Sequence, residues 1–169
     1  MEDILSNIKH STPSLPVPGA SFSVAIKRYF TNYAVFYGRA SRSEYWWSQL
    51  FVTLCFAVPA LLVFIGGMIG TAYAMSHPRP EYEGLVTYPG WVESPIALFF
   101  LLFGVILYLV VAMGSLIPTL AISWRRLHDA NFPGPIWFLS LIPFGGNIII
   151  FVFSLMPSDP QGQRFDKRR

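Results

Sequence analysis

Three long stretches of this chain contain no charged side chain. No Asp, Glu, Lys or Arg occurs from Tyr45 to Pro78, from Ser94 to Trp124, or from Ala130 to Ser158. A helix of roughly 20 mainly apolar residues crosses the hydrocarbon core of a bilayer, so each stretch is long enough to span a membrane. Charged residues make up only 12% of the 169-residue chain, against about 25% in a soluble domain. The pattern predicts an all-α integral membrane protein.

These stretches and the segments between them define a predicted domain layout. We expect a small helical bundle of three hydrophobic segments, preceded by an amphipathic helix in the headgroup region. Between residues 22 and 37, apolar and aromatic side chains recur at helical spacing, with Lys27 and Arg28 beside them, as in interfacial helices. The predicted boundaries are a mobile N-terminal tail at 1–20, a membrane domain at 21–166 with the interfacial helix at 22–37 and spans at about 45–75, 96–124 and 132–156, and a basic C-terminal end at 167–169.

The first span has a clear start signal. Ser41 is followed three residues later by Glu44, which is the spacing of a capping box. Losing such a cap costs about 1 kcal/mol of stability. Trp46 follows where an aromatic belt is expected. Arg39 and Arg42 precede the span, and the tendency of Arg to stay inside predicts a multi-pass protein of the plasma membrane with its N-terminus in the cytoplasm.

The third stretch allows two arrangements. Pro133, Pro135 and Pro143 interrupt it, and Gly145 follows the last of them. A single kinked span would place the C-terminus on the outer side. A re-entrant hairpin that turns near Pro143 would keep the basic end in the cytoplasm, as the positive-inside rule prefers. Each arm would then cover ~18 Å, roughly half of the bilayer. Both arrangements remain open from the sequence.

Two charged segments are expected to meet at one face of the membrane. After two passes the chain returns to the side from which it entered, so the segments 39–44 and 125–129 share an interface. The candidate cluster consists of Arg39, Arg42, Glu44, Arg125, Arg126, His128 and Asp129. The leading interpretation is structural: the arginines reflect membrane topology or form ion pairs with the carboxylates that hold the helix ends together. Because the arginines outnumber the carboxylates, and guanidinium binds phosphate in a bidentate manner, an anion or lipid headgroup site is the main alternative.

Signs of catalysis are weak. His128 beside Asp129 suggests an acid–base pair, but adjacent residues on a helix do not face one another, and no nucleophile accompanies them. One His and one Asp fall short of a metal site. We therefore predict no catalytic residue, metal or cofactor. The basic residues flank the apolar stretches instead of forming one long stripe, which argues against nucleic acid as a partner.

Two motifs resemble those of a known membrane family. Residues 38–47, GRASRSEYWW, resemble the opening motif of the YhaH/YhaI-like bacterial inner membrane proteins, which share a domain of unknown function (number 805). Residues 125–129, RRLHD, resemble the second motif, and the segments 137–143 and 160–165 are similar to the C-terminal part. The resemblance covers residues 29–166. It implies a bacterial inner membrane location and a helical fold, and it implies no activity.

The expected function is therefore one of interaction. We expect a non-enzymatic inner membrane protein that binds anionic lipid or a membrane partner through the cytoplasmic charged cluster. The alternative is a homo-oligomeric channel or transporter subunit, because Gly66, Gly70 and Gly114 would permit close helix contacts between copies. The predicted spans contain no Asp, Glu, Lys or Arg, which argues against a coupled transporter built from a single protomer.

Overall fold

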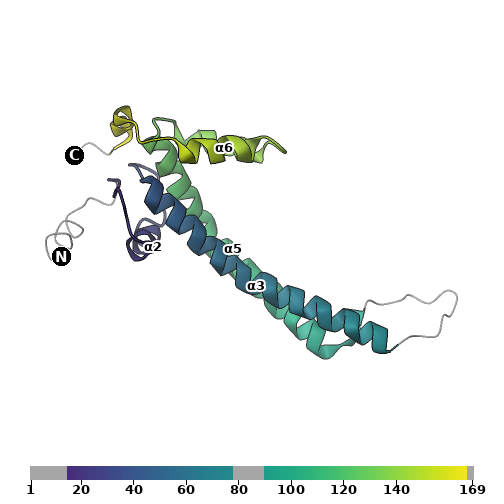
Figure 1. The fold of residues 1–169 in the computed structure, drawn as a ribbon. Helices are drawn as coiled ribbons and strands as arrows, with labels where there is room; N and C mark the ends of the chain where they lie inside the picture. Colours follow the sequence, from purple (N-terminus) through teal and green to yellow (C-terminus); the bar gives the residue numbers. More distant parts are fainter. Residues whose placement is uncertain (1–14, 78–89, 167–169) are drawn as a thin grey trace. The chain divides into compact units, whose positions relative to one another are not determined.

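The computed structural model describes residues 15–77 and 90–166, and within these ranges the chain is helical and has no strand. This confirms the predicted all-α class. The elements are α2 (Phe22–Thr31), α3 (Arg42–Ser76), the short α4 (Gly90–Glu93), α5 (Pro95–Asp129), the 3-10 helix η1 (Gly134–Leu141), α6 (Gly146–Leu155) and the 3-10 helix η2 (Pro160–Phe165), all shown in Figure 1.

Helices α3 and α5 are the two elements that are long and apolar enough to cross a membrane. In their most apolar windows only 17% and 11% of the residues are buried inside the protein. A core helix of a soluble protein would be mostly buried, whereas these helices present their apolar side chains to the exterior, as a membrane requires. Both helices extend beyond the predicted spans, and α5 continues through Asp129 at its charged end.

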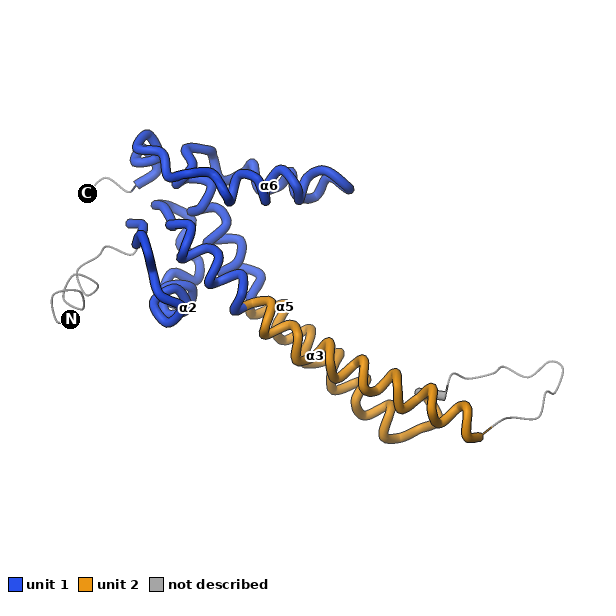
Figure 2. The backbone as a smooth tube through the Cα atoms, viewed as in Figure 1, with its two compact units in different colours: residues 1–51, 115–169 blue, residues 52–114 orange. Residues whose placement is uncertain are grey.

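The chain divides into two compact units, and both long helices contribute to each (Figure 2). Unit 2 comprises residues 52–114 and contains α3 from residue 52 to its end, α4, and α5 from its start to residue 114. Glycines allow the two helices to approach closely there. A Cβ atom on Gly66 would lie 3.0 Å from the carbonyl oxygen of Ala97, and one on Gly104 would lie 2.8 Å from the side chain of Val63. Gly66 is thus used for packing within the chain.

The predicted interfacial helix is shorter in the structure. Helix α2 ends at Thr31, not at residue 37, and the segment beyond it turns toward the start of α3. Asn32 lies at the C-cap. Asn disfavours the helix interior because its side chain competes for backbone hydrogen bonds, so it suits a helix end. Aromatic contacts join the two helices, since Phe22 packs edge-on against Trp47 at a centroid distance of 5.7 Å.

Residues 15–20 depart from the predicted mobile tail. The backbone N–H of Ala20 donates to Ser43 Oγ at 2.9 Å, and the Ser41 hydroxyl donates to the carbonyl of Val17 at 2.7 Å. These bonds fix the segment against the first turn of α3, because the hydroxyl groups of Ser41 and Ser43 bond to its backbone. Residues 1–14 of the predicted tail and 167–169 of the predicted basic end lie outside the described residues.

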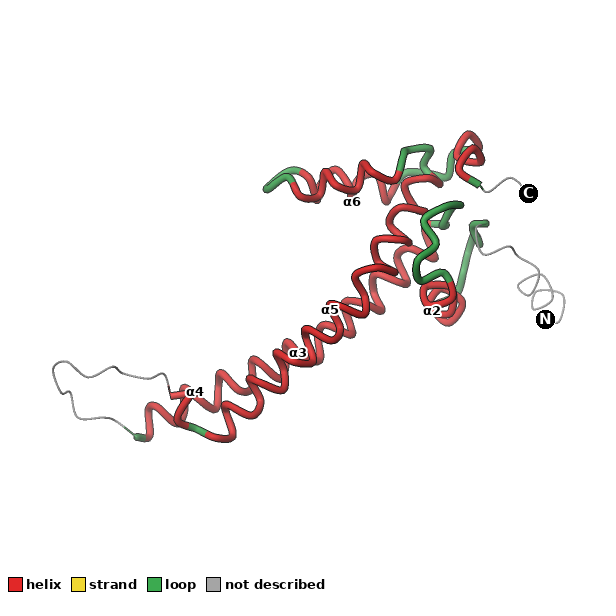
Figure 3. The backbone as a smooth tube through the Cα atoms, turned by 180° about the vertical axis from the view of Figure 1, so that it is seen from behind, coloured by secondary structure: helices red, strands yellow, loops and turns green. Residues whose placement is uncertain are grey.

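The third apolar stretch is not one continuous helix from 132 to 156. It consists of η1 and α6, separated by a break at residues 142–145 that is drawn as a loop in Figure 3. The break has a local cause, since Pro143 has no N–H and Phe144 adopts a left-handed backbone with φ of 66°. The two pieces pack closely, and a Cβ on Gly146 would lie 1.7 Å from the carbonyl oxygen of Leu139.

Candidate functional site

Unit 1 contains a group of buried and half-buried charged side chains that we call the charged head. It lies where the start of α3, the end of α5, α2 and the C-terminal segment meet. Its members are Arg28, Arg39, Glu44, Arg125, Arg126, Asp129 and Asp166.

Glu44 forms the first centre of the charged head. Its side chain is 1% exposed and accepts three donors. Oε1 forms an ion pair with Nε of Arg28, and Oε2 accepts the backbone N–H groups of Val17 at 2.8 Å and Ser41 at 2.9 Å. Ser41 Oγ in turn accepts the N–H of Glu44 at 3.3 Å, so the predicted capping box is confirmed. The carboxylate therefore connects α2, the residues before it and the start of α3.

Arg126 forms the second centre and caps the end of α6. Its Nε donates to the carbonyl of Ser154 at 3.1 Å, and its Nη2 donates to the carbonyl of Met156. The last carbonyls of a helix lack intrahelical partners and carry partial negative charge, which a buried guanidinium satisfies. Nη1 bonds to Asp129 Oδ2 at 2.8 Å, and the same oxygen accepts the Ser158 hydroxyl at 2.5 Å. The end of α5 is thereby tied to the end of α6.

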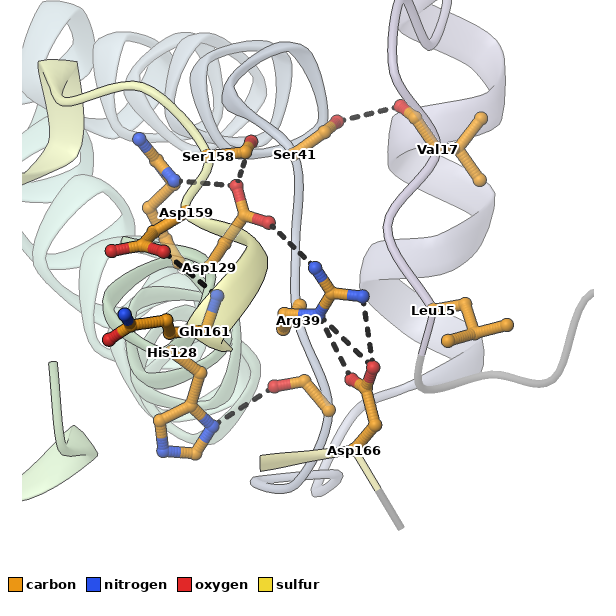
Figure 4. A network of polar contacts seen from close by, with 12 residues as sticks. Leu15, Val17, Arg39, Ser41, His128, Asp129, Ser158, Asp159, Gln161 and Asp166 are labelled. Atoms are coloured by element: carbon orange, nitrogen blue, oxygen red, sulfur yellow. Dashed lines mark hydrogen bonds and ion pairs between the residues drawn. The ribbon is translucent and has the colours of Figure 1, made fainter. Parts of the chain in front are cut away.

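Arg39 connects the loop before α3 to the C-terminal segment (Figure 4). Its Nε and Nη2 donate to the carboxylate of Asp166 at 3.1 and 2.9 Å, a two-pronged geometry that fixes orientation. Its Nη1 lies 3.9 Å from Oδ1 of Asp129, on the other side of the guanidinium. Arg39 therefore stands between two carboxylates from different segments.

The C-terminal segment lies directly against the end of α5. A Cβ on Gly162 would lie 2.4 Å from the carbonyl oxygen of His128, so only glycine allows this approach. The rings of His128 and Phe165 stack at a centroid distance of 4.1 Å, and His128 Nδ1 is 3.0 Å from the carbonyl oxygen of Gly38. The N–H of Asp159 donates to the backbone carbonyl of Asp129 at 2.8 Å. Residues 156–166 are therefore part of the charged head.

Two members of the predicted cluster behave differently from the rest. Arg125 is 1% exposed, but its Nε donates only to the carbonyl of Ala121 at 3.3 Å, and its Nη2 has no hydrogen-bond partner among the described residues. Its backbone carbonyl accepts the N–H of Ala40 at 3.0 Å. Arg42 is exposed on the first turn of α3. The structure thus brings the other five predicted residues into the network, buries Arg125 without a carboxylate hydrogen bond among the described residues, and leaves Arg42 at the surface.

Sequence reasoning missed three participants. Arg28, the ion-pair partner of Glu44, was expected on the solvated side of an interfacial helix. Asp166 and Ser158 lie in a C-terminal segment for which no site was predicted. The one available sequence signal for this region was the resemblance of segment 160–165 to the C-terminal part of the family.

The arrangement is suited to joining segments of the chain. His128 contacts Gly38 and Phe165, whereas the Asp129 carboxylate binds Arg126 and Ser158, so the two neighbours are engaged in different directions. Within residues 15–77 and 90–166, no group of three or more His, Cys, Asp or Glu side chains is placed to hold a metal ion.

Comparisons with known proteins agree with the membrane character of the fold. Residues 33–167 match the model of a family described as "Protein of unknown function (DUF805)". The chain is 30% identical over 134 residues to the "Inner membrane protein YhaH" of Escherichia coli strain K12, covering 79% of this chain and 86% of that protein. The same values hold for the protein of that name in Escherichia coli O157:H7. No solved structure matches significantly.

Proposed function

We propose that this chain, which belongs to the DUF805 family of membrane proteins, is non-enzymatic and binds anionic lipid headgroups through exposed cations around its charged head. The supporting observation is an excess of positive charge in unit 1. The described residues of unit 1 contain seven Lys and Arg side chains against four Asp and Glu. Such an excess attracts the anionic surface of the cytoplasmic leaflet.

The internal pairing of the charged head decides which cations are available to a lipid. Carboxylates of the same chain form ion pairs with Arg28, Arg39 and Arg126. These three arginines therefore hold segments of the chain together. Lys27 on α2, Arg42 on α3 and Arg164 in η2 are exposed. Arg164 donates to the carbonyl of Asn131 and lies over the ring of Phe165, so we assign headgroup binding to Lys27 and Arg42.

Aromatic side chains surround these two cations on the same elements. Phe22 and Phe30 of α2 and Trp46 and Trp47 of α3 are between 36% and 52% exposed. Aromatic rings beside cations are typical of the level where acyl chains meet headgroups. This surface supports a position of α2 and the start of α3 at the cytoplasmic membrane interface, with the N-terminus in the cytoplasm.

Native mass spectrometry of the protein released from nanodiscs tests this function. The discs contain phosphatidylglycerol and phosphatidylcholine, and the double variant Lys27→Gln/Arg42→Gln is compared with Lys27→Arg/Arg42→Lys, which preserves both charges. We expect the glutamine variant to retain several-fold less phosphatidylglycerol and the charge-preserving variant to behave like the native chain. Equal retention in all three proteins would refute the proposal. Both sites are exposed, so the substitutions leave the fold intact.

The alternative of an oligomeric channel or transporter subunit has less support. Its sequence argument relied on glycines that would allow contacts between copies, and Gly66 packs against α5 of its own chain. Gly114 has open space around its Cα, but an exposed glycine on a lipid-facing helix does not by itself indicate a second copy.

A further inference from the structure

The third apolar stretch leaves the charged head and returns to it. At its start, Ala130 follows the end of α5 directly. At its end, Met156 is bound by Arg126, and Asp166 is bound by Arg39. All these contacts lie within unit 1. A single crossing of the membrane would place the two ends of the stretch on opposite sides, so the stretch must enter and leave through the same side.

The surface of this stretch is apolar and uncovered. It contains no Asp, Glu, Lys or Arg from Ala130 to Ser158. Leu141, Phe144 and Ile148 are 72%, 100% and 63% exposed, and they lie on both pieces and at the turn between them. Contiguous apolar exposure of this kind is found where a protein contacts lipid or another protein.

Several backbone N–H groups of the turn are hydrogen-bonded within the protein, as an environment without water requires. The N–H groups of Ile142, Gly145 and Gly146 donate to carbonyls within the same turn, at 2.9, 2.9 and 3.1 Å. Pro143 has no N–H to satisfy. Lipid tolerates irregular backbone only where its polar groups are satisfied inside the protein, and this turn meets much of that demand by itself. Phe144 accepts a left-handed backbone while its ring points outward, which is unfavourable in water.

The length and direction of α6 limit how deep the stretch reaches. Its 10 residues extend about 15 Å, half of a hydrocarbon core of roughly 30 Å. In Figures 1 and 3, α6 runs at a clear angle to the adjacent end of α5 instead of alongside it. Asn147, next to the turn, is exposed, and its amide is best placed within reach of headgroups or water.

The geometry points to residues 132–156 as a hairpin that lies in a single leaflet of the bilayer, with acyl chains as the occupant of its exposed surface. The charged head fixes both ends of the hairpin at the membrane interface. Arg126, which caps α6, directly connects the charged head to the hairpin. This assignment depends on the membrane character of the chain and not on headgroup binding by Lys27 and Arg42.

Spin-label accessibility in lipid nanodiscs tests the position of the hairpin. In a Cys55→Ser background of the full chain, Phe144→Cys carries the label, Phe64→Cys on α3 serves as the hydrocarbon reference, and Gln163→Cys in η2 serves as the aqueous reference. We expect the label at 144 to collide with oxygen and to be protected from a water-soluble nickel complex, as at 64. Accessibility to nickel equal to that at 163 would overturn the assignment.

Two further measurements separate lipid from the other arrangements. In sealed vesicles, a membrane-impermeant maleimide should react with Arg42→Cys and Gln163→Cys from the same side, whereas reaction from opposite sides would show a single crossing and overturn the hairpin. Diluting the labelled protein with excess lipid should leave the protection at 144 unchanged. Protection that is lost on dilution would show that a second copy, not lipid, covers the hairpin.

Discussion

Replacing Glu44 with glutamine removes one negative charge from the charged head with almost no change in side-chain size. In the native chain both carboxylate oxygens accept bonds, from Arg28 on one side and from the N–H groups of Val17 and Ser41 on the other. Glutamine has one acceptor oxygen. If that oxygen keeps the two backbone bonds, the amide NH₂ faces the guanidinium of Arg28, donor against donor.

The expected cost follows from burial. The side chains of Arg28 and Glu44 are 10% and 1% exposed, so the guanidinium would lose its counter-charge where water does not replace it. Removing one partner of a buried ion pair costs about 3 to 5 kcal/mol. The capping box alone, which is all that the sequence revealed, predicts only about 1 kcal/mol. The difference between these values makes the structural reasoning testable.

Equilibrium unfolding of the reconstituted protein measures this cost, and a double-mutant cycle isolates the pair. Arg28→Met removes the other charge, and in the combined variant Glu44→Gln/Arg28→Met neither charge is left alone. We expect the combined loss to be smaller than the sum of the single losses by about 1 to 3 kcal/mol. Arg42→Gln, an exposed control, should change stability by less than about 0.5 kcal/mol. Additive losses, or a Glu44→Gln cost within the range of that control, would refute the ion pair.

Three further substitutions test other contacts. Gly162→Ala should lower the unfolding temperature measurably, because a methyl group cannot fit 2.4 Å from the carbonyl oxygen of His128; unchanged stability would show that η2 does not dock there. His128→Phe should keep the ring stack and lose the bond to Gly38, at a cost of about 1 kcal/mol in the same unfolding assay, and a cost near zero would contradict that bond. Gly66→Val should destabilise the protein more than Gly67→Val, because only residue 66 faces α5 closely; equal effects would contradict the packing of unit 2.

Local signals in the sequence predicted the long helices and their start. Charge-free stretches indicated α3 and α5, and the spacing of Ser41 and Glu44 predicted a capping box that the structure confirms. These features depend on residues close together in the chain. The expected meeting of residues 39–44 with 125–129 also followed from simple topology, since two passes return a chain to its starting side.

The partners within the charged head depend on distant residues and were not predictable in the same way. Periodicity assigns Arg28 to the polar side of a helix, but only the packing of α2 against α3 reveals that this side faces Glu44. Asp166 was assigned only to the end of the predicted membrane domain, and Gly162, which brings its segment against α5, belongs to no recognisable sequence pattern. The third stretch remained ambiguous because prolines are compatible with both a kink and a turn.

The order in which the ribosome makes these residues has a consequence for biogenesis. Arg126 and Asp129 emerge with α5, but the carbonyls that Arg126 binds are at the end of α6, and Ser158 and Asp166 come later still. Until residues 154–158 have been synthesised, Arg126 and Asp129 lack these hydrogen-bond partners. A message truncated after α5 would therefore yield a chain with both long helices and an unfinished interface, a suitable target for membrane proteases.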